Sequence, residues 1–237
     1  MFVMNTPSIV DVIIPAFNEE KSIAKVIGDI PALVRHVVVA NNNSTDRTAE
    51  VAKASGAVVV FEPQKGYGKA CMTAMDWIKQ QEVQPDILVF LDGDYSDYPQ
   101  ELELLIAPIV TGKAELVLGS RPMGEREAGS MTFPQVFGNA LATTLMRWMY
   151  GANFSDLGPF RAIHWGELLA LGMVDQNFGW TIEMQIKAHK AGLRYQEVPV
   201  QYRKRIGVSK VSGTVKGVIG AGYKIIFTIF KYWRPFR

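Results

Sequence analysis

Two aspartates separated by one glycine are the residues of this sequence best suited to chemistry. Asp92 and Asp94 follow the apolar run 87–91 (ILVFL), which lacks polar alternation and is typical of a strand covered on both faces. Residues two apart in an extended chain point to the same side, so the two carboxylates can converge on one hard cation, while Gly93 leaves room for a ligand. The alternative is an acidic turn that caps the next helix, and we favour that role for Asp97. The pair itself predicts a metal site that faces a phosphate.

Strand-like and helix-like segments alternate along the chain and provide the scaffold for this pair. Apolar, β-branched runs predict strands at 9–15, 36–40, 57–61, 87–91, 116–119 and 196–202. Helical spacing follows in the segments 16–30, 46–54, 66–80, 134–150, 180–191 and 215–230. This alternation predicts an α/β fold with a mostly parallel sheet flanked by helices. Such sheets bind ligands at the carboxyl ends of their strands, where the aspartates lie.

Composition limits the class of protein. The chain has 237 residues, 48% of them hydrophobic and 20% charged, which is globular and long enough for a full core. A net charge of +2 gives no support for nucleic-acid binding. One cysteine, Cys71, excludes an internal disulfide, and three scattered histidines lack zinc-ligand spacing. The first residues do not resemble a signal peptide, so we expect a cytoplasmic protein.

The C-terminal segment 211–237 predicts an amphipathic helix appended to a main domain of residues 1–210. Its apolar stretch 215–230 is shorter than the ~20 residues of a membrane-spanning helix. Lys216, Lys224 and Lys231 fall within an arc of roughly 80° on a helical wheel, with apolar residues around the rest. This pattern favours a helix lying in a membrane interface. The alternatives are packing on the sheet and a homo-oligomer interface.

Five motifs occur in one order and together resemble a known family. They are IIPAFNEE (13–20), NNNSTD (41–46), GYGKA (66–70), LDGDYSD (91–97) and RIGVSK (205–210). The chain resembles family-2 glycosyltransferases of the GT-A fold, and within them the dolichyl-phosphate-mannose-synthase branch of polyprenyl-phosphate glycosyltransferases. The resemblance spans about residue 13 to residue 210. A lone D-x-D motif is common, so the joint order of four of these motifs, P-x-x-N-E, S-T-D, D-x-D and the basic RIGVSK, carries the specificity.

The resemblance implies roles for the donor site. The expected nucleotide-binding residues are Pro15, Ala16, Asn18, Glu19, Asn41, Lys69 and Asp92. Asp92 and Asp94 would hold Mg²⁺ or Mn²⁺, and Asp94 would be catalytic. The family usually has an aspartate where this chain has Asn41, and an amide can both accept from a uracil imide and donate to a ring carbonyl. We therefore favour UDP over GDP, although a tight turn alone would also explain the asparagine run.

The acceptor side is implied by the motifs SDLGPFR (155–161), WTIEMQ (180–185) and RIGVSK. Asp156 or Glu183 could act as the base that a sugar or alcohol acceptor requires. A lipid phosphate is already an anion and needs positive residues instead. Those available are Arg121, Arg161, Arg203, Arg205 and Lys210. The expected function is an inverting, metal-dependent transfer of a hexose from a nucleotide sugar to a polyprenyl phosphate at the inner face of the membrane. The alternative is a soluble acceptor, with the C-terminal helix in a dimer interface.

Overall fold

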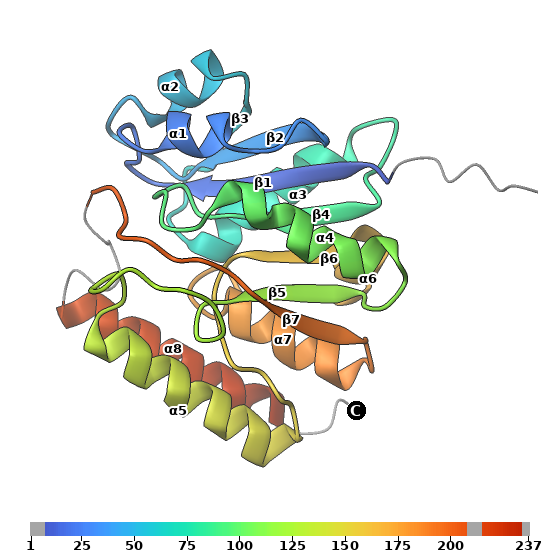
Figure 1. Cartoon of the computed structure of the whole chain (residues 1–237). Coiled ribbons are helices and arrows are strands. Elements are labelled where there is room, and N and C mark those ends of the chain that lie inside the picture. Colours follow the sequence, from blue (N-terminus) through green and yellow to red (C-terminus); the bar gives the residue numbers. More distant parts are fainter. Residues whose placement is uncertain (1–7, 208–214, 234–237) are drawn as a thin grey trace, which may run out of the picture.

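The centre of the molecule is a seven-stranded sheet with the order β3-β2-β1-β4-β6-β5-β7 (Figure 1). The structure is a computed structural model, and it describes residues 8–207 and 215–233. The strands are β1 Val10–Ala16, β2 Val34–Asn41, β3 Val58–Phe61, β4 Ile87–Phe90, β5 Leu116–Ser120, β6 Arg161–His164 and β7 Tyr195–Pro199. β6 is antiparallel to β4 and β5, and the other neighbouring pairs are parallel. The prediction of an α/β fold with a mostly parallel sheet is confirmed.

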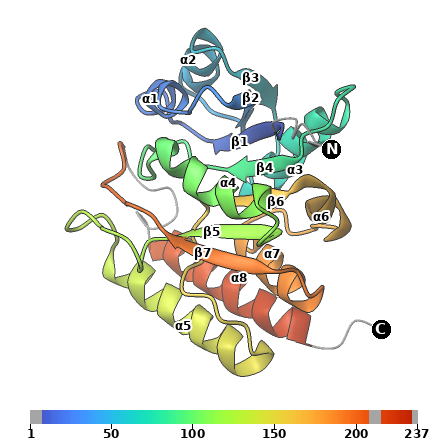
Figure 2. The same cartoon turned by 45° about the vertical axis from the view of Figure 1, so that its right-hand side comes forward.

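Helices cover both faces of the sheet. They are α1 Ile23–Gly28, α2 Thr48–Ala54, α3 Tyr67–Lys79, α4 Leu102–Val110, α5 Phe133–Tyr150, α6 Trp165–Ala170, α7 Trp180–Lys190 and α8 Val215–Trp233, with a short 3-10 turn at Pro99–Glu101. Successive strand residues point to opposite faces. Val12 and Ile14 therefore pack with α1, α2 and α4, whereas Ile13 packs in the larger core with α3 and α5 to α8. Figure 2 shows this layered arrangement from a second direction.

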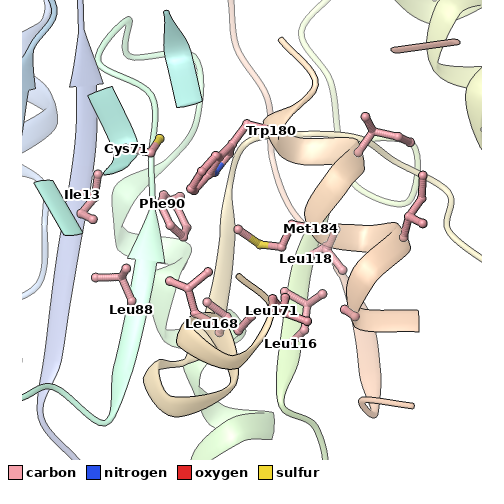
Figure 3. Close-up of a cluster of buried hydrophobic side chains, with 14 of the residues drawn as sticks. Ile13, Cys71, Leu88, Phe90, Leu116, Leu118, Leu168, Leu171, Trp180 and Met184 are labelled. Carbon is pink, nitrogen blue, oxygen red and sulfur yellow. The ribbon is translucent and has the colours of Figure 1, made fainter. Parts of the chain in front are cut away.

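The strand before the two aspartates ends in rigid packing. Phe90, the last residue of β4, meets Trp180 at the start of α7 edge-to-face, with ring centroids 6.1 Å apart. Both rings are fully buried, and Cys71 and Met184 belong to the same cluster (Figure 3). The aromatic pair fixes the end of β4 against α3 and α7. The loop carrying Asp92 therefore leaves the core from a fixed point.

Helices α5 and α8 lie side by side along one flank of the molecule (Figures 1 and 2). α5 begins with a capping box between Thr132 and Gln135 and ends at Gly151, which adopts a left-handed conformation. α8 buries Ile229 and Tyr232 in the larger core, so it is packed onto the main domain. The expected boundary at 210/211 falls outside the described residues. Among the described helices, none combines the length and hydrophobicity needed to cross a bilayer.

Candidate active site

A pocket of about 530 Å³ opens at the carboxyl ends of the central strands. Its polar end is formed by the loops after β1, β2, β4 and β5, which contribute Glu19, Asn42, Asp92 and Arg121. Its other end is bounded by α5 and α8, which contribute mainly small and apolar residues. These are Pro134, Gln135, Gly138 and Asn139 from α5, and Ala221, Gly222 and Ile225 from α8. A charged end and an apolar end therefore share one cavity.

Asp92 and Asp94 both line this pocket, as the strand pattern predicted. Asp94 is buried, and its Oδ1 accepts hydrogen bonds from the Ser96 amide (2.9 Å) and hydroxyl (2.5 Å). Its Oδ2 lies 2.8 Å from Nη1 of Arg205. The Tyr67 hydroxyl donates to Oδ1 of Asp92 over 3.1 Å. Each carboxylate is thus oriented by a neighbour before any ligand arrives.

The charge balance of this pair suits a divalent cation. Burial, and then the nearby Asp94 charge, raise the pKa of Asp92 to about 7, against the opposing effect of Arg205. A cation between the two carboxylates would relieve this repulsion. In the described residues no third His, Cys, Asp or Glu completes a protein-only cage. Mg²⁺ commonly binds to one or two carboxylates together with substrate phosphates, so the pair fits a metal–diphosphate complex.

Three cationic side chains line the same pocket as the carboxylates. Arg121 and Arg205 line the pocket as predicted, and Lys65 lines it unpredicted. The Lys65 ammonium lies 4.8 Å from the centroid of the Phe17 ring. Arg121 is anchored by a two-pronged ion pair to Asp156, with Nε–Oδ2 at 2.7 Å and Nη2–Oδ1 at 2.6 Å. Positive charge therefore faces the place where a diphosphate would meet the metal.

Pro15, Ala16 and Glu19 line the pocket, but three other predicted nucleotide residues do not. Asn18 Oδ1 accepts from the Thr45 amide (2.8 Å), which ties two loops together. Asn41 Oδ1 accepts from the Ser44 amide (3.1 Å), the turn role that we had kept as the alternative. Lys69 lies in the first turn of α3, outside the lining, and its amide donates to Gln176 O (2.9 Å). The lysine that lines the pocket is Lys65, four residues earlier in the chain.

The structure does not support either predicted general base. Asp156 is fully buried and its carboxylate is taken up by Arg121; burial would raise its pKa, but Arg121 and main-chain donors hold it below the usual value. Glu183 is also fully buried. It accepts from the Val174 and Asp175 amides, pairs with Lys187 and accepts from the Tyr232 hydroxyl (2.7 Å). Neither carboxylate lines the pocket, because each organises a loop instead.

Arg161 and Arg203 also have structural contacts rather than pocket contacts. The buried Arg161 guanidinium donates to Thr181 O (2.9 Å) and Gly158 O, and burial lowers its pKa to about 10. Arg203 stacks on the Tyr95 ring, 3.4 Å from its centroid, and donates to Tyr95 O. Neither side chain lines the pocket, so the structure gives no support to the expectation that these two bind acceptor phosphate. Lys210 lies outside the described residues.

Asp97 is not the helix cap that we expected. Tyr98 is the residue that precedes the 3-10 turn, and neither carboxylate oxygen of Asp97 has a hydrogen-bond partner among the described residues. The side chain is buried near Asp92 and Asp94, and burial followed by these two charges raises its pKa well above the usual value. Burial and these neighbouring charges favour the neutral form of the Asp97 carboxyl.

Sequence reasoning missed several residues of the lining. Lys65 lies in the loop after β3, Tyr67 is the first residue of α3, and Asn177 and Phe178 come from the segment before α7. Asn42, rather than Asn41, faces the pocket, and its amide bridges Gln64 O and the Gly66 amide. The position of Lys65 after a parallel strand was a usable signal. The segment at 177 and 178 carried no such signal.

The chain is similar to known proteins over most of its length. The model for "Glycosyl transferase family 2" matches residues 11–166. The chain is 36% identical to an "uncharacterized glycosyltransferase" of Mycobacterium tuberculosis over 95% of this chain and 96% of that protein. It is 30% identical to a dolichyl-phosphate hexose transferase of Haloferax volcanii, covering 84% of this chain and 85% of the relative.

Among solved structures, glucosyl-3-phosphoglycerate synthase from Mycobacterium tuberculosis, in complex with Mn²⁺, UDP and phosphoglyceric acid, has the same fold. The TM-score is 0.75 at 22% identity, over 97% of this chain and 80% of that one. The predicted GT-A fold is thus confirmed, and the extent of the family match, together with the relatives, identifies the chain as an enzyme that belongs to glycosyl transferase family 2.

Proposed function

We propose that this enzyme is an inverting, metal-dependent hexosyltransferase that moves a hexose from a nucleotide sugar to a polyprenyl phosphate at the cytoplasmic face of a membrane. The observation that carries the proposal is the shared cavity, which joins the carboxylate pair at one end to α5 and α8 at the other. A nucleotide diphosphate suits the first end and the start of an isoprenoid chain suits the second. The dolichyl-phosphate hexose transferase among its relatives supports the same acceptor class.

The outer faces of α5 and α8 support a membrane-bound acceptor. Large apolar side chains are exposed along both helices, and we call them the apolar face: Phe133, Val136, Phe137, Leu141 and Trp148 on α5, and Ile219, Tyr223, Phe227, Phe230 and Trp233 on α8. Phe133, Trp148 and Tyr223 are 81%, 80% and 70% exposed. Contiguous apolar patches of this kind mark protein or membrane contacts, and aromatic rings suit the lipid interface.

The site can stabilise the leaving diphosphate without a protein base. Asp92 and Asp94 would hold Mg²⁺ or Mn²⁺, which supplies positive charge to the departing diphosphate. Arg205 and Lys65 both line the pocket and would add positive charge there. Both predicted bases are buried and occupied, which suits a phosphate acceptor, because such an acceptor is already an anion.

UDP is the donor nucleotide that we favour. The solved fold neighbour that contains UDP and Mn²⁺ supports this choice. Asn41 no longer supports it by direct contact, because its side chain lies outside the pocket lining. A panel of UDP- and GDP-sugars measured by thermal shift with Mn²⁺ would decide between the nucleotides, since only binding to the folded state raises the melting point.

Transfer of labelled sugar from UDP-glucose or GDP-mannose tests the acceptor. We expect a lipid-linked product when undecaprenyl phosphate is supplied in vesicles with Mn²⁺, and none with EDTA. The alternative of a soluble acceptor, with α8 in a dimer interface, predicts transfer to a phosphorylated small molecule and a dimer by light scattering. Absence of lipid-linked product with every sugar nucleotide would refute the proposed acceptor.

Vesicle flotation tests the apolar face separately from catalysis. The double variant Phe133→Ser/Tyr223→Ser removes two exposed rings without touching the pocket lining, and we expect it to lose flotation. Phe61→Ser is the matched control, because Phe61 is 60% exposed on β3 at the far edge of the sheet. Equal flotation of the double variant and this control would remove the membrane contact from the proposal.

A further inference from the structure

The C-terminal helix contacts the loop that forms one wall of the donor pocket. This loop, residues 174–179, precedes α7, and we call it the bridging loop. Nζ of Lys224 on α8 lies 2.9 Å from Oδ2 of Asp175 in the loop. Oδ1 of Asp175 accepts from the amides of Asn177 (2.8 Å) and Gly179 (3.1 Å). One carboxylate therefore folds the loop and ties it to α8.

The packing between the bridging loop and α8 leaves little room for movement. A Cβ at Gly179 would lie 2.4 Å from Asp175 Oδ2 and 2.8 Å from Thr228 Oγ1 of α8. Tyr232, also on α8, donates to Glu183, whose carboxylate accepts from the Asp175 amide over 2.7 Å. α8 thus holds the loop at two points, Lys224 directly and Tyr232 through Glu183.

On its other side, the bridging loop packs against the start of α3. Gln176 O accepts from the Lys69 amide (2.9 Å), which satisfies one of the free donors of the first helical turn. A Cβ at Gly66 would lie 2.2 Å from Gln176 O, and one at Gly68 would lie 2.0 Å from Asp175 O. The first residue of α3 is Tyr67, the side chain that donates to Asp92. A displaced loop would therefore displace the partner of a predicted metal ligand.

We propose that Lys224 is a positioning residue for the donor site: through Asp175 and the bridging loop it seats the start of α3, and with it the hydrogen bond from Tyr67 to Asp92. The role rests on the proposed nucleotide–metal function of this pocket. It makes α8 part of the donor site as well as a wall of the acceptor end. Asn177 and Phe178, which line the pocket, belong to the same loop and would shift with it.

Calorimetric titration of the full-length protein with UDP, in Mn²⁺ and in EDTA, tests the role. Lys224→Met removes the charge at similar length, and Asp175→Asn keeps an oxygen for the two loop amides. We expect each substitution to weaken UDP binding in Mn²⁺ by about 5-fold or more, which is the smallest affinity change typical of coupled sites. The loss of affinity in EDTA should be smaller. The double variant should bind UDP with the same affinity as the single variants, because the two substitutions break the same ion pair. Lys224→Arg should retain most of the affinity.

Lys79→Met is the matched control, since Lys79 pairs with Asp76 at 3.0 Å on the exposed far end of α3. A melting curve for each variant shows that the fold is kept. Wild-type affinity in a folded Lys224→Met protein, or additive losses in the double variant, would overturn the positioning role alone. Failure of the wild-type protein to bind either UDP or GDP with Mn²⁺ would instead refute the donor proposal, and the positioning role with it.

Discussion

Substitution of Asp156, which forms a buried ion pair with Arg121, tests whether this aspartate is structural or catalytic. Asp156 was a predicted general base, but its carboxylate accepts from Nε, Nη2 and the main-chain amide of Arg121, at 2.7, 2.6 and 2.9 Å. Asp156→Asn keeps the shape and removes the charge. An amide would place an NH₂ donor against the guanidinium donors and leave Arg121 buried without its counter-ion.

The expected loss of stability follows from the burial of both partners. Breaking a buried pair by neutralising one side costs about 3–5 kcal/mol. For a chain of this size, about 2–4 °C per kcal/mol predicts a melting temperature lower by roughly 6–20 °C. Asp76→Asn is the control: it breaks the exposed pair with Lys79 and should cost at most about 1 kcal/mol.

The pH dependence of this loss has a definite sign. The pKa of Asp156 is lowered in the folded state, so its contribution to stability is full above its unfolded value of 3.8 and is lost as the pH falls through the folded pKa. The difference in melting temperature between the wild type and Asp156→Asn should therefore be largest near neutral pH and should decrease in acid.

Differential scanning calorimetry, together with turnover measured below both melting points, checks this reasoning. We expect the folded variant to keep the wild-type pH profile of kcat, with any loss of rate attributable to the displaced Arg121. If Asp156→Asn melts with the wild type but loses turnover together with the acidic limb of the profile, where protonation of a general base reduces kcat, the structural interpretation is wrong and Asp156 is the base.

Three further predictions concern the acidic loop. Asp94→Asn should weaken Mn²⁺-dependent UDP binding by more than about 10-fold, as measured by titration calorimetry. Loss of a residue that only supports a metal ligand already lowers metal affinity by about 10–100-fold, and Asp94 is predicted to be a ligand itself. Mn²⁺ affinity should rise roughly tenfold from pH 6 to pH 8, because Asp92, with a pKa of about 7, must release its proton to bind the metal; a flat profile would contradict this. Asp97→Asn should melt above the wild type at pH 8 and lose that advantage toward pH 4, because a raised folded pKa makes the buried acid increasingly destabilising as pH rises; a lower melting point at pH 8 would refute its neutral state.

The alternation of strands and helices could be predicted from the sequence because most strands, such as β3 (VVVF) and β4 (ILVF), are rich in apolar residues and lie between polar turns. β6 could not be predicted in this way, because its four residues, Arg161–His164, form no extended apolar run. That strand exists because β4 and β5 supply hydrogen-bond partners on both sides, pairing Leu88 and Leu116 with the same residue, Ile163. Pairing between distant segments decides such a strand, and no local window contains it.

The sequence by itself determined the carboxylate pair, since Asp92 and Asp94 follow a buried strand and lie two residues apart in the same loop. Only the tertiary structure decided which of several similar side chains enter the pocket. Tyr67 begins α3 and contacts Asp92, while Lys69, roughly 200° further around the helix, does not line the pocket. Asp156 and Glu183 likewise look catalytic in the sequence, but the fold supplies each with a buried cation and main-chain donors. The side of a helix that faces the pocket and the residues that pack against each carboxylate fix these roles. Both are decided only when segments distant in the sequence come together.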